Sequence, residues 1–278
     1  MSLIHECSGV VSQDFGTDFK AGDRVVMIPN IPAEEREGKY ENYGREVKFR
    51  SSGYDGFMQE VLALPPDRVV KIGKADPKTA AITEFFSVAF HAIERLLDAT
   101  QDVRDLALWG DGSLSYTMAV ALRHRFPEAR LTIIGRNDHK LRMFTFVDQT
   151  FKADEIPADF TCQHAIECCG GEGSSFAIDD IIRYILPEGK VVLMGVSENK
   201  VAINTRDILE KGLTFLGSSR SGRPDFENAV QAMNIPQNER RLARIINYAG
   251  EVKSVDQLHR VFVEDMANPF KTVFRWQI

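Results

Sequence analysis

Two glycines near the middle of the chain, Gly110 and Gly112, have the spacing of a turn that binds the phosphates of a dinucleotide. They follow an apolar run at residues 106–109 and precede a helical pattern that starts at Tyr116. Gly110 allows a tight turn, and Gly112 lets backbone N–H groups approach a pyrophosphate at the positive end of the helix. Ser115 replaces the third glycine of the usual pattern and is small enough for close packing. The alternative is an ordinary strand-to-helix turn.

The residues after the second apolar run, 131–134, indicate which dinucleotide is bound. An acidic residue there would accept hydrogen bonds from the ribose of NAD, whereas Arg136 offers a guanidinium suited to a 2′-phosphate. Asn137 adjoins it, and Lys140 adds a second positive charge one helical turn later. This pattern favours NADP(H). The alternative is a surface arginine that only stacks on the adenine.

Glycines end three later apolar runs, at Gly170, Gly195 and Gly217. Ligands of parallel sheets lie outside the carboxyl ends of the strands, where the backbone must come close to them. Each glycine alone is weak evidence. Together they favour a nucleotide at that edge of the sheet.

The sequence also offers a possible metal site. His5 and Glu6 are adjacent and can offer a ring nitrogen and a carboxylate to zinc. Glu84 is a carboxylate within an otherwise apolar helical stretch. A buried carboxylate needs a cation or a hydrogen-bond partner, and a metal meets that need. The alternative is an exposed His-Glu pair together with an ordinary surface glutamate.

The strands and helices expected to carry these residues divide the chain into two parts. Residues 4–68 are β in character, with short apolar stretches at 8–11, 24–28 and 57–64, and suggest a small barrel fragment. Its polar segment at 29–53 either covers something or is a solvated excursion.

Helices are expected over residues 77–97, and beyond them strands and helices alternate, which predicts an α/β fold with a doubly wound parallel sheet. The strands expected are 106–109, 131–134, 162–167, 190–194 and 214–217, and the helices 116–125, 138–146 and 174–185. The chain then continues with helices at 226–233 and 239–248 and a final strand at 271–276. We place the catalytic domain at residues 1–80, with 245–278 returning to it, and the dinucleotide-binding domain at 81–244.

Composition narrows the classes of partner. A net charge of −6 argues against nucleic acid or a membrane surface held by a general electrostatic field, so we expect a small-molecule ligand. The sequence has no apolar run of about eighteen residues and no cleavable leader. Its four cysteines, Cys7, Cys162, Cys168 and Cys169, form no C-x-x-C pair, which fits a reducing cytoplasm.

Three segments carry a resemblance to a family. Residues 4–11 resemble the G-H-E-x-x-G-x-V segment of the zinc-dependent medium-chain alcohol dehydrogenases, with Ile4 in place of the glycine. Residues 22–25 resemble that family's G-D-R-V turn, and residues 84–92 the E-P-L-S-V-x-x-H-A of its polyol branch.

The resemblance implies a Rossmann domain joined to a GroES-like β-barrel catalytic domain, incomplete in this chain, and a homodimer. It also implies that His5 and Glu6 belong to the catalytic zinc site, with Glu84 as a further ligand or a carboxylate close to it. Lys271 matches the family's basic contact to the cofactor pyrophosphate.

A narrower similarity, at residues 49–60, 109–112 and 217–221, is to the ribulose-5-phosphate reductases. It implies NADPH-dependent reduction of ribulose 5-phosphate to ribitol 5-phosphate, the supply of CDP-ribitol for cell-wall or capsular polymers. A sugar phosphate needs cationic contacts, for which Arg50 with Ser51, or Arg220, are candidates. The alternatives are a polyol or alcohol dehydrogenase of the same family and a catalytically silent NADPH-binding protein.

Two departures from the family pattern bear on zinc. The family's structural-zinc lobe would fall within residues 29–53, which hold no cysteine, so we expect no structural zinc. The family also has roughly sixty residues ahead of its G-H-E segment, including a cysteine that is the first zinc ligand. We therefore expect a chain shortened at its N-terminus, with weak zinc affinity and little activity. Cys7 directly follows Glu6 and should point elsewhere along a strand.

Overall fold

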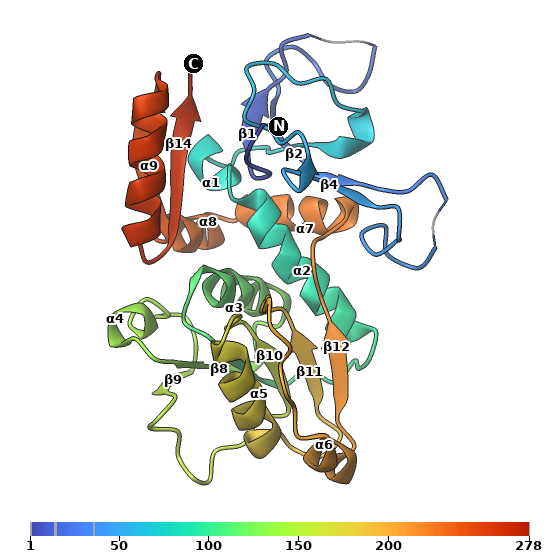
Figure 1. The fold of residues 1–278 in the computed structure, drawn as a ribbon, viewed down its shortest axis with the longest axis vertical. Coiled ribbons are helices and arrows are strands. Elements are labelled where there is room, and N and C mark those ends of the chain that lie inside the picture. Colours follow the sequence, from blue (N-terminus) through green and yellow to red (C-terminus); the bar gives the residue numbers. More distant parts are fainter. Residues whose placement is uncertain (1, 14–15, 36, 278) are drawn as a thin grey trace. The chain divides into compact units, whose positions relative to one another are not determined.

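A computed structural model describes residues 2–13, 16–35 and 37–277 (Figure 1). The chain forms two compact units. The first unit contains the residues up to Phe90 and those from Arg220 onward, and the second contains His91–Ser219. Residues 220–244, which we expected in the dinucleotide-binding domain, lie in the first unit. There, the Arg223 side chain donates to the carbonyl oxygens of Pro66 and Val69 at 3.2 and 3.1 Å.

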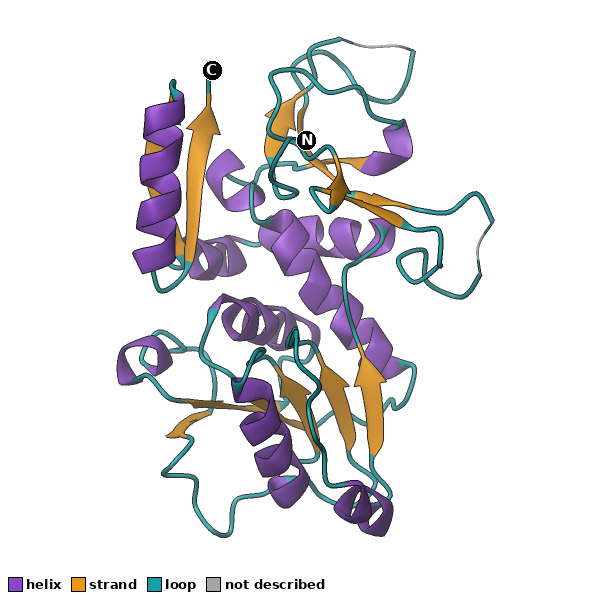
Figure 2. Ribbon diagram, viewed as in Figure 1, coloured by secondary structure: helices purple, strands orange, loops and turns teal. Residues whose placement is uncertain are grey.

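The second unit is built on a parallel sheet whose strand order is β12-β11-β10-β7-β8-β9. In that order the strands are Thr214–Gly217, Lys190–Leu193, His164–Glu167, Asp105–Trp109, Arg130–Gly135 and Gln149–Lys152. The helices between them are α3 (Ser113–Arg125), α4 (Asp138–Leu141), α5 (Gly173–Tyr184) and α6 (Thr205–Lys211). This confirms the predicted doubly wound α/β fold, and Figure 2 shows the alternation.

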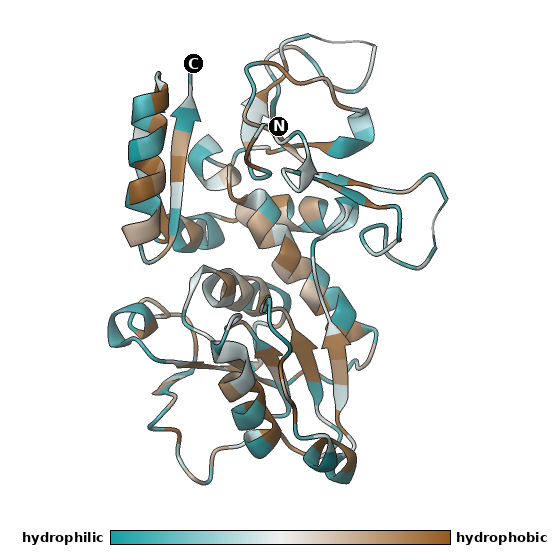
Figure 3. Cartoon of the chain, in the orientation of Figure 1, coloured by the Kyte–Doolittle hydropathy of each residue, from teal (hydrophilic) through white to brown (hydrophobic). Residues whose placement is uncertain are grey.

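The direction of winding reverses between β7 and β10. The chain runs outward from β7 through β8 to β9, then returns to β10 on the other side of β7 and runs to β12. Because such crossovers are right-handed, α3 and α5 cover opposite faces of the sheet. The middle residues of strands β10, β11 and β12 are apolar (Figure 3), and those of β10 and β11 are buried, as expected of strands covered by helices. Ligands of these sheets bind where the winding reverses, at the carboxyl ends of β7 and β10.

The first unit is made of small sheets joined by long loops. Three antiparallel strands pair in the order β1-β2-β6, namely Ser8–Val10, Arg24–Met27 and Val69–Lys71. A second sheet has the order β3-β4-β5, namely Asn30–Ile31, Lys48–Arg50 and Gly53–Tyr54, with β3 and β4 antiparallel and β4 and β5 parallel. A 3₁₀ turn, η1 (Pro66–Arg68), precedes β6. The helices are α1 (Pro77–Ala80), α7 (Arg223–Met233), α8 (Pro236–Ala243) and α2 (Thr83–Leu97), whose C-terminal part belongs to the second unit. The chain then forms β13 (Ile246–Val252), α9 (Val255–Ala267) and β14 (Lys271–Trp276).

The structure corrects three expected elements. Residues 57–64 form no strand, because the N–H groups of Phe57 and Met58 donate to the carbonyls of Ile4 and Leu3 outside any ladder. The helix expected at 239–248 ends at Ala243, and β13 follows because it pairs in parallel with β14. The helix expected at 138–146 ends at Leu141.

The polar segment at 29–53 is fixed to the rest of the first unit through Glu41. The Glu41 carboxylate accepts hydrogen bonds from Arg68 Nη1 at 2.9 Å and from the backbone N–H of Arg223 at 3.0 Å. The segment therefore covers the start of α7, which favours the first of its two interpretations. None of the helices within the described ranges combines the length and apolar character that a membrane crossing requires.

Candidate functional site

The first unit brings together the three residues predicted to hold a metal. One ligand atom each of His5, Glu6 and Glu84 lies within 4.8 Å of the other two. His5 Nε2 is 3.8 Å from Glu84 Oε2. His5 and Glu6 precede β1, and Glu84 lies in the first turn of α2. Two segments about eighty residues apart in the sequence thus meet at one point.

The segment that carries His5 is held by backbone contacts to residues 56–58. The N–H of Phe57 donates to Ile4 O at 2.7 Å, and the N–H of Met58 donates to Leu3 O at 3.0 Å. A Cβ at Gly56 would overlap both acceptor carbonyls, so this position requires glycine. Ile4, where the family has glycine, has a φ of +64°, a conformation that costs a β-branched residue strain. Gly56 and the left-handed backbone of Ile4 therefore both help to position His5.

Burial determines the charge of the cluster. Burial and, to a smaller extent, the neighbouring Glu6 carboxylate together raise the pKa of Glu84 to about 8, while Lys271 opposes the shift. Burial lowers the pKa of His5, with Glu6 raising it and Lys271 lowering it. The His5 ring is therefore neutral near pH 7, the form in which imidazole binds a metal.

Lys271 belongs to the same cluster. Its Nζ lies 2.6 Å from Glu6 Oε1 and 4.1 Å from the centre of the Phe85 ring. The ammonium group therefore balances the charge of Glu6. Its predicted contact with a cofactor pyrophosphate stays a prediction.

The donor set fits zinc. One imidazole nitrogen and two carboxylates are ligands that zinc accepts, and a cation between Glu6 and Glu84 would offset the cost of burying two carboxylates side by side. Cys7 takes no part: its Sγ lies 3.4 Å from Met27 Sδ, and burial raises the pKa of its thiol to about 12. This agrees with the expectation that Cys7 points elsewhere.

In the second unit, the glycine turn lies at the carboxyl end of β7. Gly110 has a φ of +131°, and a Cβ there would lie 2.9 Å from the carbonyl oxygen of Cys168, so only glycine suits the position. Gly112 is the N-cap residue of α3 and has open space around its α-carbon. Ser115 is fully buried, and its hydroxyl has no hydrogen-bond partner among the residues that the structure places. An open helix N-terminus and a small buried hydroxyl beside it fit a dinucleotide pyrophosphate.

The residues predicted to choose the cofactor are fixed to this turn by Asp111, which sequence reasoning missed. Asp111 Oδ2 accepts hydrogen bonds from the N–H groups of Arg136 and Asn137, each at 2.7 Å. Asn137 in turn caps α4 by accepting from the N–H of Lys140 at 3.2 Å. The Arg136 side chain is exposed and forms no ion pair within the described part of the chain. The only signal for Asp111 in the sequence was an acidic residue between two glycines.

Glu167 is a second residue that the sequence did not single out. Its buried carboxylate accepts from the N–H groups of Cys169, Gly170 and Gly195 at 2.8, 3.1 and 2.9 Å. A Cβ at Gly195 would lie 2.5 Å from that carboxylate. Glu167 therefore joins the carboxyl ends of β10 and β11 at the edge where a nucleotide would bind.

The candidates for a substrate phosphate lie in different surroundings. Arg50 Nη1 donates to Asp55 O at 3.2 Å, and its guanidinium lies 5.6 Å from the Phe57 ring centre. The N–H of Ser51 donates to Tyr54 O at 2.8 Å. The guanidinium of Arg220 lies 4.9 Å from the centre of the Phe49 ring, which is 5.1 Å from that of the His5 ring.

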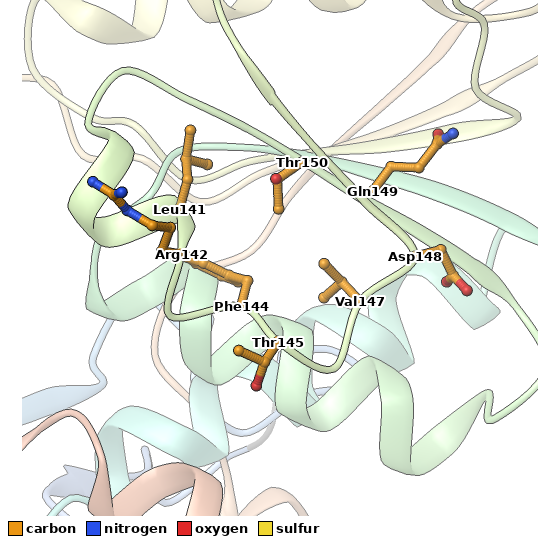
Figure 4. A pocket seen from close by; sticks show the side chains of 8 residues that line it. All are labelled: Leu141, Arg142, Phe144, Thr145, Val147, Asp148, Gln149 and Thr150. Carbon is orange, nitrogen blue, oxygen red and sulfur yellow. The ribbon is translucent and has the colours of Figure 1, made fainter.

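A hollow of about 230 Å³ lies elsewhere in the second unit (Figure 4). It is smaller than most small-molecule sites, and no residue predicted to bind cofactor or substrate lines it. Its lining residues are Leu141, Arg142, Phe144, Thr145, Val147, Asp148, Gln149 and Thr150.

Comparisons with known proteins agree with this geometry. Residues 1–74 match the alcohol dehydrogenase GroES-like domain. The chain is 47% identical over 280 residues to a ribulose-5-phosphate reductase of Streptococcus pneumoniae, covering 100% of this chain and 81% of the relative. It is 43% identical to one of Bacillus spizizenii, covering 100% of this chain and 83% of the relative. The crystal structure of Staphylococcus aureus TarJ in complex with NADPH superposes with a TM-score of 0.87 at 37% identity, covering 100% of this chain and 82% of that one.

Proposed function

The chain belongs to the ribulose-5-phosphate reductase family of the zinc-dependent medium-chain dehydrogenases, and we propose that it reduces ribulose 5-phosphate to ribitol 5-phosphate with NADPH. The observation that carries the proposal is the meeting of His5, Glu6 and Glu84 within 4.8 Å of one another. The relatives' names supply the substrate, and the bound NADPH of the TarJ structure supplies the hydride donor.

His5, Glu6 and Glu84 are the residues that would hold a catalytic zinc. When bound, zinc polarises a ketone oxygen and stabilises the negative charge that develops on it. Neutral His5 offers its ring nitrogen, and Lys271 keeps the second carboxylate, Glu6, from adding uncompensated charge.

The second unit binds and orients the cofactor. The N-terminus of α3 at Gly112 receives the pyrophosphate, and Arg136 with Lys140 binds the 2′-phosphate. Hydride passes from NADPH to the ketone carbon of ribulose 5-phosphate, and the oxygen gains a proton, so that the products are NADP⁺ and the alcohol. The ribitol 5-phosphate formed would serve CDP-ribitol synthesis for cell-wall or capsular polymers.

We further infer a homodimer in the cytoplasm. The family resemblance implies pairing through an edge strand, and β12 is an edge strand with one hydrogen-bonded neighbour in the sheet. Light scattering coupled to gel filtration should give twice the mass of the chain. A monomeric mass would contradict the dimer and leave the proposed activity standing.

The activity is tested by following NADPH oxidation at steady state with ribulose 5-phosphate and with unphosphorylated ribulose. We expect kcat/KM to fall by roughly a hundredfold or more without the phosphate, because a charge-assisted phosphate contact is lost. Equal rates would indicate a polyol dehydrogenase. NADPH binding without turnover of any ketone would indicate a catalytically silent protein.

A further inference from the structure

Arg220 is the residue that we propose binds the phosphate group of the substrate, an inference that rests on the proposed reduction of a sugar phosphate. The sequence left Arg50, Ser51 and Arg220 as equal candidates. Three observations in the first unit support Arg220, although Ser51 shares its left-handed backbone with a φ of +62°.

The first observation is the state of its guanidinium. The Arg220 side chain is half-buried and stacked on the Phe49 ring, with the guanidinium carbon 4.9 Å from the ring centre. Among the described residues it forms no hydrogen bond and no ion pair, so its five N–H donors point to no protein acceptor. Two other arginines of the same unit do have carboxylate partners, since Arg68 has Glu41 at 2.9 Å and Arg223 has Glu227 at 2.8 Å. Stacking fixes the plane of the Arg220 fork and leaves it open to an anion.

The second observation is the backbone. Arg220 has a φ of +60°, which is costly for a residue with a Cβ and persists only where the surroundings fix it. The following residue, Ser221, is buried and its hydroxyl lies 2.7 Å from that of Ser87. The Ser87 hydroxyl donates to the carbonyl oxygen of Glu84 at 2.6 Å. The strained arginine is thus fastened to the helical turn that carries a residue of the metal cluster.

The third observation is distance. Arg220 and His5 both contact the Phe49 ring, whose centre is 4.9 Å from the guanidinium carbon and 5.1 Å from the imidazole centre. The guanidinium therefore lies no more than 10 Å from the His5 ring. In ribulose 5-phosphate, five bonds separate the ketone carbon from phosphorus, about 6 Å in an extended chain. A ketone held at the cluster can place its phosphate on Arg220.

Arg50 is less suited to the same task. Its Nη1 already donates to Asp55 O at 3.2 Å, whereas the Arg220 guanidinium has no such bond among the described residues. This contact makes Arg50 a support of the segment that holds His5.

The test compares Arg220→Gly, Arg220→Lys and Arg50→Ala with the unmodified protein. Arg220→Gly removes the guanidinium and relieves the backbone strain, so its melting temperature should equal or exceed that of the unmodified protein. Arg183→Ala is the matched control, because Arg183 is stacked on the ring of Tyr184 at 5.1 Å in the second unit. The probes are ribitol 5-phosphate and ribitol, with affinities measured by calorimetry, and ribulose 5-phosphate and ribulose, with kcat/KM measured at steady state.

We expect Arg220→Gly to bind ribitol 5-phosphate roughly 10- to 150-fold more weakly, the range for loss of one charge-assisted hydrogen bond. Its kcat/KM should fall by a similar factor for ribulose 5-phosphate and stay unchanged for ribulose. Arg220→Lys should recover part of the affinity for ribitol 5-phosphate. Arg183→Ala should change neither the affinity for ribitol 5-phosphate nor that for ribitol.

If the unmodified protein prefers the phosphorylated ligands and Arg220→Gly keeps that preference, the assignment of Arg220 is overturned while the proposed function stands. Loss of the preference in Arg50→Ala alone would also overturn it, in favour of Arg50. If the unmodified protein shows no preference, the proposed function fails and the inference fails with it.

Discussion

At the scale of single residues, the chemistry depends on how each side chain's surroundings set its charge. Glu84 is a buried carboxylate beside a second carboxylate, and its pKa of about 8 reflects the cost of ionising it there. A bound cation removes that cost, so the same contacts that disfavour the charged Glu84 favour a metal. Asp111 and Glu167 show the opposite use of a carboxylate, because each accepts backbone N–H groups and so fixes a loop.

Zinc binding should depend on Glu84. Replacing Glu84 with Gln removes one of the two carboxylates among the three ligands and should weaken zinc affinity at least tenfold, measured by competition with a chromophoric chelator. Glu60→Gln is the matched control, because Glu60 is an exposed glutamate outside the cluster. Equal zinc affinity in Glu84→Gln and Glu60→Gln would exclude Glu84 as a ligand.

Cofactor choice should depend on Arg136. Arg136→Ala should raise the KM for NADPH by roughly 10- to 150-fold, because a charge-assisted contact to the 2′-phosphate is lost, and leave the KM for NADH unchanged. Arg142→Ala serves as the control, since the Arg142 guanidinium donates within its own helical turn, to Asp138 O at 3.3 Å. An equal effect on both cofactors would show that Arg136 only stacks on the adenine.

At the scale of elements, loops at the carboxyl ends of neighbouring strands are joined by carboxylates. In each case a carboxylate from one loop accepts hydrogen bonds from backbone N–H groups of the next. Asp111 joins the turn after β7 to the turn after β8, and Glu167 joins the turn after β10 to that after β11. The glycine pattern predicted that the backbone comes close at this edge. It could not predict the two carboxylates. Each accepts hydrogen bonds from backbone N–H groups of a neighbouring loop or of its own turn, and the periodicity of the sequence does not indicate such partners.

Loss of the Asp111 carboxylate should therefore affect the cofactor through position rather than direct contact. Asp111→Ala leaves the N–H groups of Arg136 and Asn137 without their acceptor, and we expect KM for NADPH to rise more than KM for NADH. Asp111→Asn keeps an acceptor oxygen and should restore most of the NADPH affinity. If Asp111→Ala altered kcat alone, the positioning role would be refuted.

The amino ends of β10 and β11 give a prediction about pH. His164 Nδ1 accepts from the N–H of Lys190 at 3.1 Å, and its Nε2 lies 2.8 Å from Asp102 O, so the neutral ring satisfies both contacts. Burial lowers the pKa of His164, with Lys190 lowering it further and Asp102 and Asp105 opposing.

A histidine with a lowered pKa stabilises the fold above its unfolded value of 6.5, and this stability is lost as the pH falls through the folded value. Thermal unfolding followed by circular dichroism should show a falling melting temperature below about pH 6.5. The fall should be smaller in His164→Gln, whose side chain does not titrate. The same slope in both proteins would refute the role of His164.

At the scale of the whole molecule, the sequence predicted the doubly wound sheet and the two segments that bring His5, Glu6 and Glu84 together. It failed where long-range pairing decides the structure. Residues 246–248 read as the end of a helix, yet they belong to β13, because β14 pairs with them from more than twenty residues away. Residues 57–64 read as a strand, yet the first of them serve the His5 segment. Apolar spacing alone does not specify such partners.

The proposed reaction transfers hydride from NADPH to the ketone of ribulose 5-phosphate. The most direct measurement uses NADPH deuterated at the transferable position and analyses the product by mass spectrometry and NMR. We expect ribitol 5-phosphate with a single deuterium on the carbon that was the ketone, formed together with NADP⁺. Ribitol 5-phosphate without deuterium would contradict this reaction. Reduction of unphosphorylated ribulose with no formation of ribitol 5-phosphate from ribulose 5-phosphate would contradict it as well.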